Sequence, residues 1–143
     1  MRRARRAVPL RLIPRLHRAT HRLGLEIAGW PDLGVTQAEA HVLDHLATMG
    51  PSTVGTLHDA FAHRRSTLTS VLDRLVERAL VRRDSSPEDR RTFVVRLTPA
   101  GQQVAHQVHD RLQAIEARAR AAVSPRDVQG FDRVLAALAA GKK

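Results

Sequence analysis

Apolar residues recur at helical spacing in the first part of the chain, between Pro9 and Ile27. They are three, four or seven positions apart, which places them on one face of a helix, and the stripe consists of Leu12, Leu16, Ala19, Leu23 and Ile27. The segment GWPDLGVT then breaks the pattern with glycine and proline. Thr36 is placed to cap a second helix, which we expect to bury Val42, Leu43, Leu46 and Met49.

Two shorter helical patterns follow and are joined by the segment AHRR, residues 62–65. Ser52 or Thr53 can cap the first of them, which carries the apolar residues Val54, Leu57 and Phe61. The second has apolar residues, again at helical spacing, at Leu68, Val71, Leu72 and Leu75. Two helices joined by a tight turn form a helix-turn-helix.

After Leu80 the apolar period falls from about 3.6 residues to about 2, which indicates strands. The predicted strands are LVRRD and TFVVRL, and they flank the charged loop SSPEDRR. Thr98 and Pro99 introduce a fifth helix, and Ser124 introduces a sixth. We expect the sixth helix to bury a stripe formed by Val128, Phe131, Val134, Leu135 and Leu138.

Four helices, a β-hairpin and two helices in this order predict a mainly α fold with a small β-hairpin wing. This is a winged helix-turn-helix with further helices at the two ends of the chain. In such a fold the second helix of the pair enters the major groove of DNA, and the hairpin reaches beside it.

The charge balance supports a nucleic-acid partner. Lys and Arg total 24 against 14 Asp and Glu, so the formal net charge is +10 at pH 7, which points to a polyanion such as DNA, RNA or an anionic membrane. No apolar run approaches the roughly 18 residues of a membrane span, so we expect no membrane partner. The chain contains no cysteine, which suits a cytoplasmic location.

The arginine-rich start of the sequence, MRRARRAVPL, has two interpretations. It superficially resembles an organelle transit peptide, but it lacks serine and a cleavage-like site. We favour a basic arm that either lies against phosphates or stays solvated, formed by Arg2, Arg3, Arg5 and Arg6.

Four stretches together resemble the MarR family of bacterial transcription regulators. They are VTQAEAHVLDHLATMGPSTVGTLHDAF, RRSTLTSVLDRLVERALVRR, SSPEDRRTFVVRLTPAG and SPRDVQGFDRVLAALA. The resemblance implies a two-fold homodimer held by the first and last helices, a wing that reaches the minor groove, and control by a bound effector. It divides the chain into an N-terminal arm and dimerisation helix (1–35), a winged helix-turn-helix domain (36–98) and C-terminal dimerisation helices (99–143).

Polar residues on the outer side of the second helix of the pair are the main predicted DNA contacts. Short hydroxyl side chains let a helix approach bases or phosphates, and arginines at its start can take a phosphate or a guanine edge. One of Ser66 and Thr67 is also expected to cap the helix. With the wing, the predicted contact set is Arg64, Arg65, Ser66, Thr67, Thr69, Ser70, Arg74, Arg82, Arg90 and Arg91.

The charged residues at the wing tip are interpreted as an arginine that enters the minor groove and an acid that holds the loop in position. A guanidinium can enter a narrow minor groove, where the negative potential is enhanced, and we assign this role to Arg90. Asp89 is expected to hold Arg91 in position, because a free carboxylate there would repel phosphate. The acids of the preceding helix, Asp73 and Glu77, are interpreted as ordinary surface charges beside arginines of the same helix.

Two turns depart from the family pattern. Ala62 and His63 stand where the family usually has glycine and an apolar residue, and Ala79 stands where glycine usually ends the recognition helix. A left-handed alanine costs about 1 kcal/mol. Either turn can therefore differ locally from the family, and the tilt of the recognition helix with it.

Histidine pairs raise the question of a ligand. His41, His45, His106 and His109 fall on the second and fifth helices at spacings of four and three, which suit a divalent metal. No zinc motif of the family is matched, so we expect no metal and no cofactor. A small-molecule pocket between the first, second and fifth helices is what the resemblance implies, with the candidate residues Trp30, Leu33, His41, His45 and His106.

The predicted function is that of a dimeric, sequence-specific transcription regulator, a repressor that a small-molecule effector releases from double-stranded DNA. Two recognition helices one helical turn apart would read an inverted repeat. An architectural nucleic-acid-binding protein and a zinc-responsive regulator of the same fold are the alternatives. Catalysis is not expected, because the sequence has no HExxH motif, nucleophile elbow, phosphate-binding glycine loop or cofactor fingerprint.

Overall fold

The computed structural model describes residues 11–61 and 64–141. Within them the helices are α1 (Leu12–Ala28), α2 (Gln37–Met49), α3 (Val54–Phe61), α4 (Arg65–Glu77), α5 (Pro99–Ala121) and α6 (Pro125–Ala139), and the strands are β1 (Ser52–Thr53), β2 (Val81–Ser85) and β3 (Phe93–Leu97). This order confirms the predicted mainly α winged helix-turn-helix. None of these helices is long and apolar enough to cross a membrane. The predicted basic arm, Pro9, and the turn residues Ala62 and His63 lie outside the described residues.

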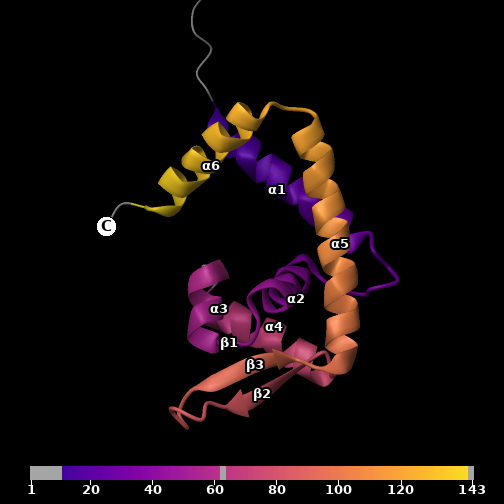
Figure 1. Ribbon diagram of the computed structural model, residues 1–143, viewed down its shortest axis with the longest axis vertical. Coiled ribbons are helices and arrows are strands. Elements are labelled where there is room, and N and C mark those ends of the chain that lie inside the picture. Colours follow the sequence, from indigo (N-terminus) through magenta and orange to yellow (C-terminus); the bar gives the residue numbers. More distant parts are fainter. Residues whose placement is uncertain (1–10, 62–63, 142–143) are drawn as a thin grey trace, which may run out of the picture.

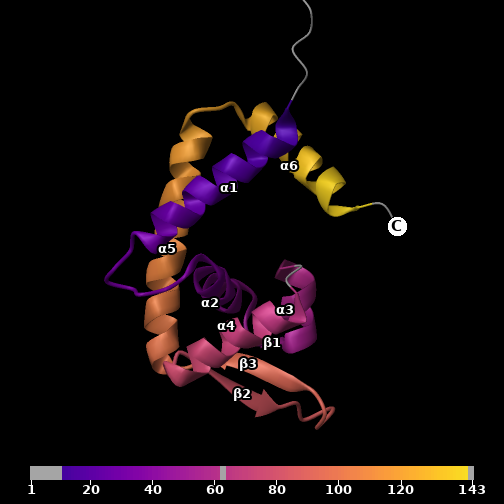
Figure 2. The same cartoon turned by 180° about the vertical axis from the view of Figure 1, so that it is seen from behind.

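The long helix α5 connects two ends of the molecule (Figure 1). At one end α2, α3, α4 and the sheet form a lobe from which the β2–β3 wing projects, and at the other end lie α1 and α6 (Figures 1 and 2). The sheet is antiparallel, in the order β1–β3–β2. Strands β2 and β3 pair from Val81 opposite Leu97 to Ser85 opposite Phe93, so the wing is a regular hairpin.

The hydrophobic core lies in the lobe, where α2, α3, α4 and α5 pack around β3. Its fully buried side chains include Leu43, Leu57, Leu72, Leu75, Val95 and Val108. Burial of each such side chain contributes about 1.5–3 kcal/mol. The core therefore holds the helix-turn-helix and the base of the wing in one unit.

Side-chain caps begin three helices where the sequence predicts them. Thr36 Oγ1 accepts a hydrogen bond from Glu39 N (3.3 Å), and Glu39 Oε2 accepts one from Thr36 N (2.9 Å), which together form a capping box. Thr98 caps α5 through its hydroxyl oxygen, and Ser124 forms a second capping box with Asp127 at the start of α6. These caps satisfy amide groups that have no acceptor within their own helix.

Two predictions of burial are wrong for the single chain. Met49 is 72% exposed, because it is the last residue of α2 and lies beyond the edge of the core. Helix α6 has no buried residue, and its Phe131 is 52% exposed. The reason is that α6 lies at the far end of α5 from the core (Figure 1).

Ser52 and Thr53 form strand β1 instead of a simple cap. They pair with Val95 and Val94 of β3, and Thr53 Oγ1 also accepts a hydrogen bond from Thr56 N (3.0 Å). Thr53 therefore both extends the sheet and caps α3. The sequence predicted the cap alone, because sheet pairing depends on residues far along the chain.

Ala79 ends the recognition helix in the left-handed conformation, with φ 52°. Leu80 N donates to Leu75 O (2.9 Å) and Ala79 N donates to Val76 O (2.8 Å), which is the pattern of a Schellman motif. Leu75 and Leu80 both belong to the buried core cluster. The alanine thus takes the conformation of the glycine that the family usually has here, because these contacts outweigh its strain.

Replacing Ala79 with glycine should stabilise the fold by up to about 1 kcal/mol, because glycine takes a positive φ without a clash of Cβ. The greater freedom of glycine in the unfolded chain offsets part of the gain. Equilibrium denaturation at a fixed protein concentration measures the change. The control is Ala114→Gly, an exposed site in the middle of α5, which should lose about 1 kcal/mol. Equal losses in both variants would show that Ala79 is not strained.

Candidate nucleic-acid interface

Helix α4 presents an apolar face to the core and a polar face to solvent. All four predicted inward residues are buried, namely Leu68, Val71, Leu72 and Leu75. The opposite face is exposed and carries Arg65, Ser66, Thr67, Thr69, Ser70 and Arg74. The structure thus brings these predicted contact residues onto one open surface.

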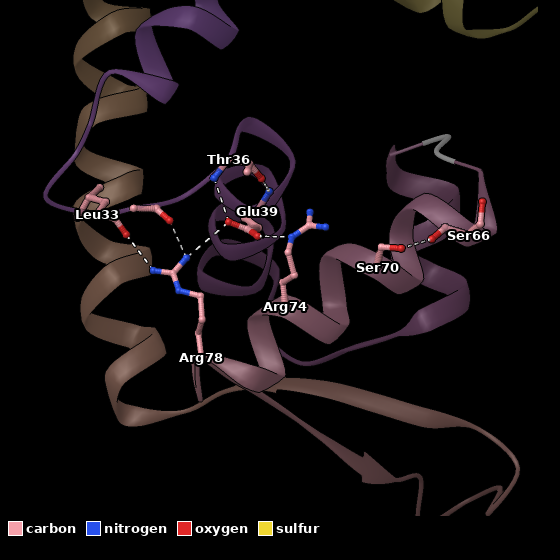
Figure 3. Close-up of polar contacts among 8 residues, drawn as sticks. Leu33, Thr36, Glu39, Ser66, Ser70, Arg74 and Arg78 are labelled. Carbon is pink, nitrogen blue, oxygen red and sulfur yellow. Dashed lines mark hydrogen bonds and ion pairs between the residues drawn. The ribbon is translucent and has the colours of Figure 1, made fainter.

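The hydroxyl groups of this face donate hydrogen bonds within the helix. Thr69 Oγ1 donates to Arg65 O (2.9 Å), and Ser70 Oγ donates to Ser66 O (3.0 Å; Figure 3). Each hydroxyl oxygen keeps lone pairs that can accept a further hydrogen bond. In this arrangement the hydroxyl oxygens of Thr69 and Ser70 can accept hydrogen bonds from the amino groups on the edges of bases.

The start of α4 differs from the prediction. Arg64 is the N-cap residue, and its side chain makes no capping hydrogen bond. Neither Ser66 nor Thr67 caps the helix, because both lie inside it, after its first residue Arg65. The main-chain N–H groups of the first turn of α4 are therefore not used by a side-chain cap. Together with the positive charges of Arg64 and Arg65, they favour binding of an anion such as phosphate.

Arg74 lies on the same face but turns toward α2. Its Nε donates to Glu39 Oε1 (2.8 Å), and Arg78 Nη1 lies 3.5 Å from Glu39 Oε2 (Figure 3). Arg78 also donates to the carbonyl oxygens of Leu33 (3.0 Å) and Gly34 (2.8 Å). Sequence reasoning missed this network. The T-x-x-E spacing at the start of α2 signals a capping box, but it does not show that the glutamate is buried against α4.

Glu39 is only 3% exposed, yet its environment favours the charged form. Burial by itself raises the pKa of the carboxyl group, but hydrogen bonds from Arg74 and Thr36 N and the charges of Arg74 and Arg78 outweigh it. Together they hold the pKa of Glu39 below its ordinary value of 4.5. Such a group stabilises the fold above its unfolded pKa, and this contribution is lost as the pH falls through its folded pKa.

The free energy of unfolding should therefore decrease in acid, below the ordinary pKa of 4.5. Glu39→Gln cannot ionise, so the advantage of the wild type over this variant should shrink as Glu39 is protonated. Chemical denaturation of both proteins from about pH 6 to about pH 3 measures the difference. A difference that stays constant over this range would contradict an ionised Glu39.

The wing tip, residues 86–92, is held by its own polar groups. Asp89 Oδ1 accepts a hydrogen bond from Arg91 N (2.9 Å), and Asp89 Oδ2 accepts one from Thr92 Oγ1 (3.1 Å). Asp89 therefore holds Arg91 through the main-chain N–H of Arg91, and not through the guanidinium. Arg90 and Arg91 are both exposed at the tip.

Arginines pair with two further carboxylates near the wing, those of Asp84 and Asp73. Asp84 Oδ2 lies 3.2 Å from both Arg82 Nε and Arg96 Nε. Arg83 Nη2 donates to Asp73 Oδ1 (2.8 Å), so the partner of Asp73 comes from the wing and not from its own helix. This contact links β2 of the wing to α4.

Comparisons with known proteins agree with this geometry. The family model that matches the sequence is described as the MarR family and covers residues 33–92. The wild-type MarR protein from E. coli in its apo form is 27% identical, with a TM-score of 0.69 over 92% of this chain and 97% of that chain. Residues 33–92 of this chain are a MarR-family domain.

Two further solved structures share the fold of this chain. A mutant of MarR from E. coli in complex with operator DNA is 23% identical, with a TM-score of 0.76 over 90% of this chain and 94% of that chain. BpsR from Bordetella bronchiseptica, whose DNA binding is regulated by 6-hydroxynicotinic acid, is 24% identical, with a TM-score of 0.78 over 93% of this chain and 96% of that chain. No curated protein matches the sequence. With a MarR-family domain at residues 33–92, the chain is a DNA-binding transcription regulator.

A cavity of about 530 Å³ lies between α1, α2 and α5. This is where the resemblance implies an effector. Its lining combines apolar and polar side chains, including Leu23, Ile27, His41, Asp44, Leu112 and Glu116. Among the candidate pocket residues, His41 lies in this cavity.

The other candidate pocket residues lie elsewhere. Leu33 belongs to the buried core, and Trp30 packs against this core. The Arg111 guanidinium lies 5.4 Å from the centre of the Trp30 ring. His45 contacts the β1 serine (Nε2 to Oγ, 3.3 Å). His106 lines a separate cleft beside the sheet. The five residues therefore do not form one pocket.

The candidate metal ligands do not form one set either. His109 Nδ1 lies 2.8 Å from Asp44 Oδ1, which makes it part of a contact between α5 and α2. Within residues 11–61 and 64–141, no three His, Cys, Asp or Glu side chains come together in a way that could hold a metal ion.

Proposed function

We propose that this MarR-family chain is a dimeric repressor that reads an inverted-repeat operator in double-stranded DNA in the cytoplasm and releases it when a small molecule binds. The surface shared by α4 and the wing carries the proposal. Its arginine and hydroxyl side chains are exposed, and α4 belongs to the lobe from which the wing projects (Figure 1). A duplex placed on this lobe meets the recognition helix and the wing together.

Helix α4 enters the major groove, as the recognition helix of a helix-turn-helix does. Arginines at its start take a phosphate or a guanine edge, and the hydroxyl groups contact phosphates or the amino groups of bases. Arginines of the wing reach the minor groove and the backbone beside it. The proposed contacts are Arg64, Arg65, Ser66, Thr67, Thr69, Ser70, Arg82, Arg90 and Arg91.

A second copy of the chain covers the apolar face of α6. This face is formed by Phe131, Val134, Leu135 and Leu138, which are all exposed, and it continues into a groove of about 620 Å³ between α5 and α6. A contiguous apolar patch is unfavourable in water, and pairing about a two-fold axis buries it on both copies. Residues 1–35 and 99–143 then form the dimer, and residues 36–98 bind half-sites about 10 bp apart.

The cavity between α1, α2 and α5 is the proposed effector site. It joins helices of the dimer region to the first helix of the DNA-binding region, so a ligand there can favour one arrangement of the two. The regulation of BpsR by 6-hydroxynicotinic acid supports control of this kind. The effector can change the operator affinity by at most the ratio of its own affinities for the two arrangements.

Titration of the protein against the DNA upstream of its own gene and against a scrambled duplex of the same composition tests this function. At physiological salt the upstream duplex should bind more tightly by a factor on the order of 1,000 or more. Equal affinity for the two duplexes would contradict a sequence-specific regulator and favour an architectural nucleic-acid binder.

A further inference from the structure

The buried carboxylate of Glu39 has more partners than a helix cap needs. A capping box needs a single hydrogen bond from the N-cap amide to the glutamate, and Glu39 Oε2 accepts it from Thr36 N (2.9 Å). Glu39 Oε1 accepts a further hydrogen bond from Arg74 Nε (2.8 Å), and Arg78 Nη1 lies 3.5 Å from Oε2. Glu39 is therefore a charged joint between the start of α2 and the second half of α4 (Figure 3).

Arg78 extends this joint to the segment between α1 and α2. Its guanidinium donates to Gly34 O (2.8 Å) and Leu33 O (3.0 Å). The same segment is held against α5, because Arg111 Nη1 donates to Asp32 Oδ1 (3.0 Å). A continuous set of polar contacts thus leads from α5 through residues 32–34 to the recognition helix.

The joint lies next to the DNA-reading part of α4. Arg74 follows Ser70 by four positions, which is one helical turn along the same face. Fixing Arg74 and Arg78 against Glu39 therefore fixes the rotation of α4 about its axis and its position along that axis. Hydrogen bonds to base edges tolerate heavy-atom distances of only about 2.7–3.2 Å, so a small rotation of α4 is enough to lose them.

We propose that Glu39 is a positioning residue for operator recognition and that it acts through Arg74 and Arg78, without itself touching DNA. Arg74, a predicted DNA contact, thereby becomes part of the joint. The inference rests on the proposed function, because it requires that α4 reads an operator.

The test is a titration with operator and scrambled duplexes at several salt concentrations, using Glu39→Gln, Arg74→Gln and the double variant. Glutamine offers one acceptor oxygen where glutamate offers two, so Glu39→Gln loosens the joint and removes no cation. Operator affinity should fall about tenfold or more, while affinity for the scrambled duplex stays at the wild-type value. The double variant should bind no more weakly than the weaker single variant, because both residues act in one contact.

The salt dependence separates positioning from phosphate contact. Loss of one phosphate contact in each subunit reduces the slope of log affinity against log salt by about 1.8. We expect the slope of Glu39→Gln and of Arg74→Gln to equal that of the wild type. Glu77→Gln is the matched control, since it makes the same charge change at an exposed carboxylate of α4, and its operator affinity should stay within about twofold.

Wild-type operator affinity in Glu39→Gln, or a slope reduced by about 1.8 in Arg74→Gln, overturns the positioning role. Circular dichroism at the assay temperature verifies that each variant is folded. Should Glu39→Gln unfold, Arg74→Gln decides the question alone, because the Arg74 side chain is 47% exposed and is replaced at a lower cost to the fold. If the wild-type protein binds the operator and the scrambled duplex equally well, the proposed function itself is overturned. This outcome differs from failure of the positioning role, in which the wild-type protein still prefers the operator.

Discussion

Replacing Arg65 with alanine should weaken operator binding by a factor on the order of 100. Arg65 is the first residue of α4 and its side chain is exposed, so it is free to approach a base edge or a phosphate. A good arginine contact to a base contributes about 1–3 kcal/mol of discrimination. A dimer loses this contact at both half-sites, so the two losses multiply. Competition titration with a labelled operator measures the change, and thermal denaturation should show an unchanged midpoint.

Arg18→Ala is the matched control for this prediction. Arg18 is an exposed arginine of α1, a helix at the opposite end of the molecule from the wing (Figure 1). The control removes the same charge, and its operator affinity should stay within about twofold of the wild-type value. Equal losses in the two variants would show that total charge, and not contact by α4, determines binding.

Replacing Gly101 with alanine should destabilise the fold by roughly 3 kcal/mol. Gly101 lies in the first turn of α5, where an added Cβ would be 1.8 Å from Leu80 O and 2.8 Å from Leu80 C. The backbone at Leu80 cannot move away freely, because Leu80 O accepts hydrogen bonds from Thr98 N (3.0 Å) and Thr98 Oγ1 (3.2 Å). Relief of the clash therefore breaks contacts that hold α5 against the end of α4. Urea denaturation at a fixed protein concentration should show a lower midpoint.

Gly55→Ala makes the same substitution where there is room. Gly55 lies in α3, and the nearest atom to its added Cβ is Thr53 Oγ1 at 3.7 Å. Alanine is favoured over glycine in a helix by about 0.8–1.0 kcal/mol, so this variant should be at least as stable as the wild type. Wild-type stability in Gly101→Ala would contradict the close approach of α5 to Leu80.

Features that depend on neighbouring residues were predictable from the sequence. Thr36 and Ser124 cap their helices as predicted, and Thr98 caps the helix that it was predicted to introduce. A cap needs only a side-chain oxygen and an amide two or three residues ahead. The buried face of α4 and the paired strands of the wing were predictable for the same reason. Their periods of 3.6 and 2 residues are local properties of the chain.

Contacts between distant segments were not predictable. The helical period of Met49 and of Phe131 shows which residues share their face, but it does not show whether another element covers that face. The spacing of Thr36 and Glu39 likewise indicates a cap and says nothing of the arginines that α4 brings to it. The DNA-reading surface could therefore be predicted as the outer face of α4 with the wing, whereas the joint beneath it required the structure.

Hydroxyl-radical footprinting of the upstream duplex tests most directly the claim that paired α4 helices and wings read DNA. We expect two protected segments related by two-fold symmetry, with centres about 10 bp apart, and added protection in the flanking minor grooves. A single protected segment, or uniform protection of every duplex, would contradict recognition by a pair of winged helices.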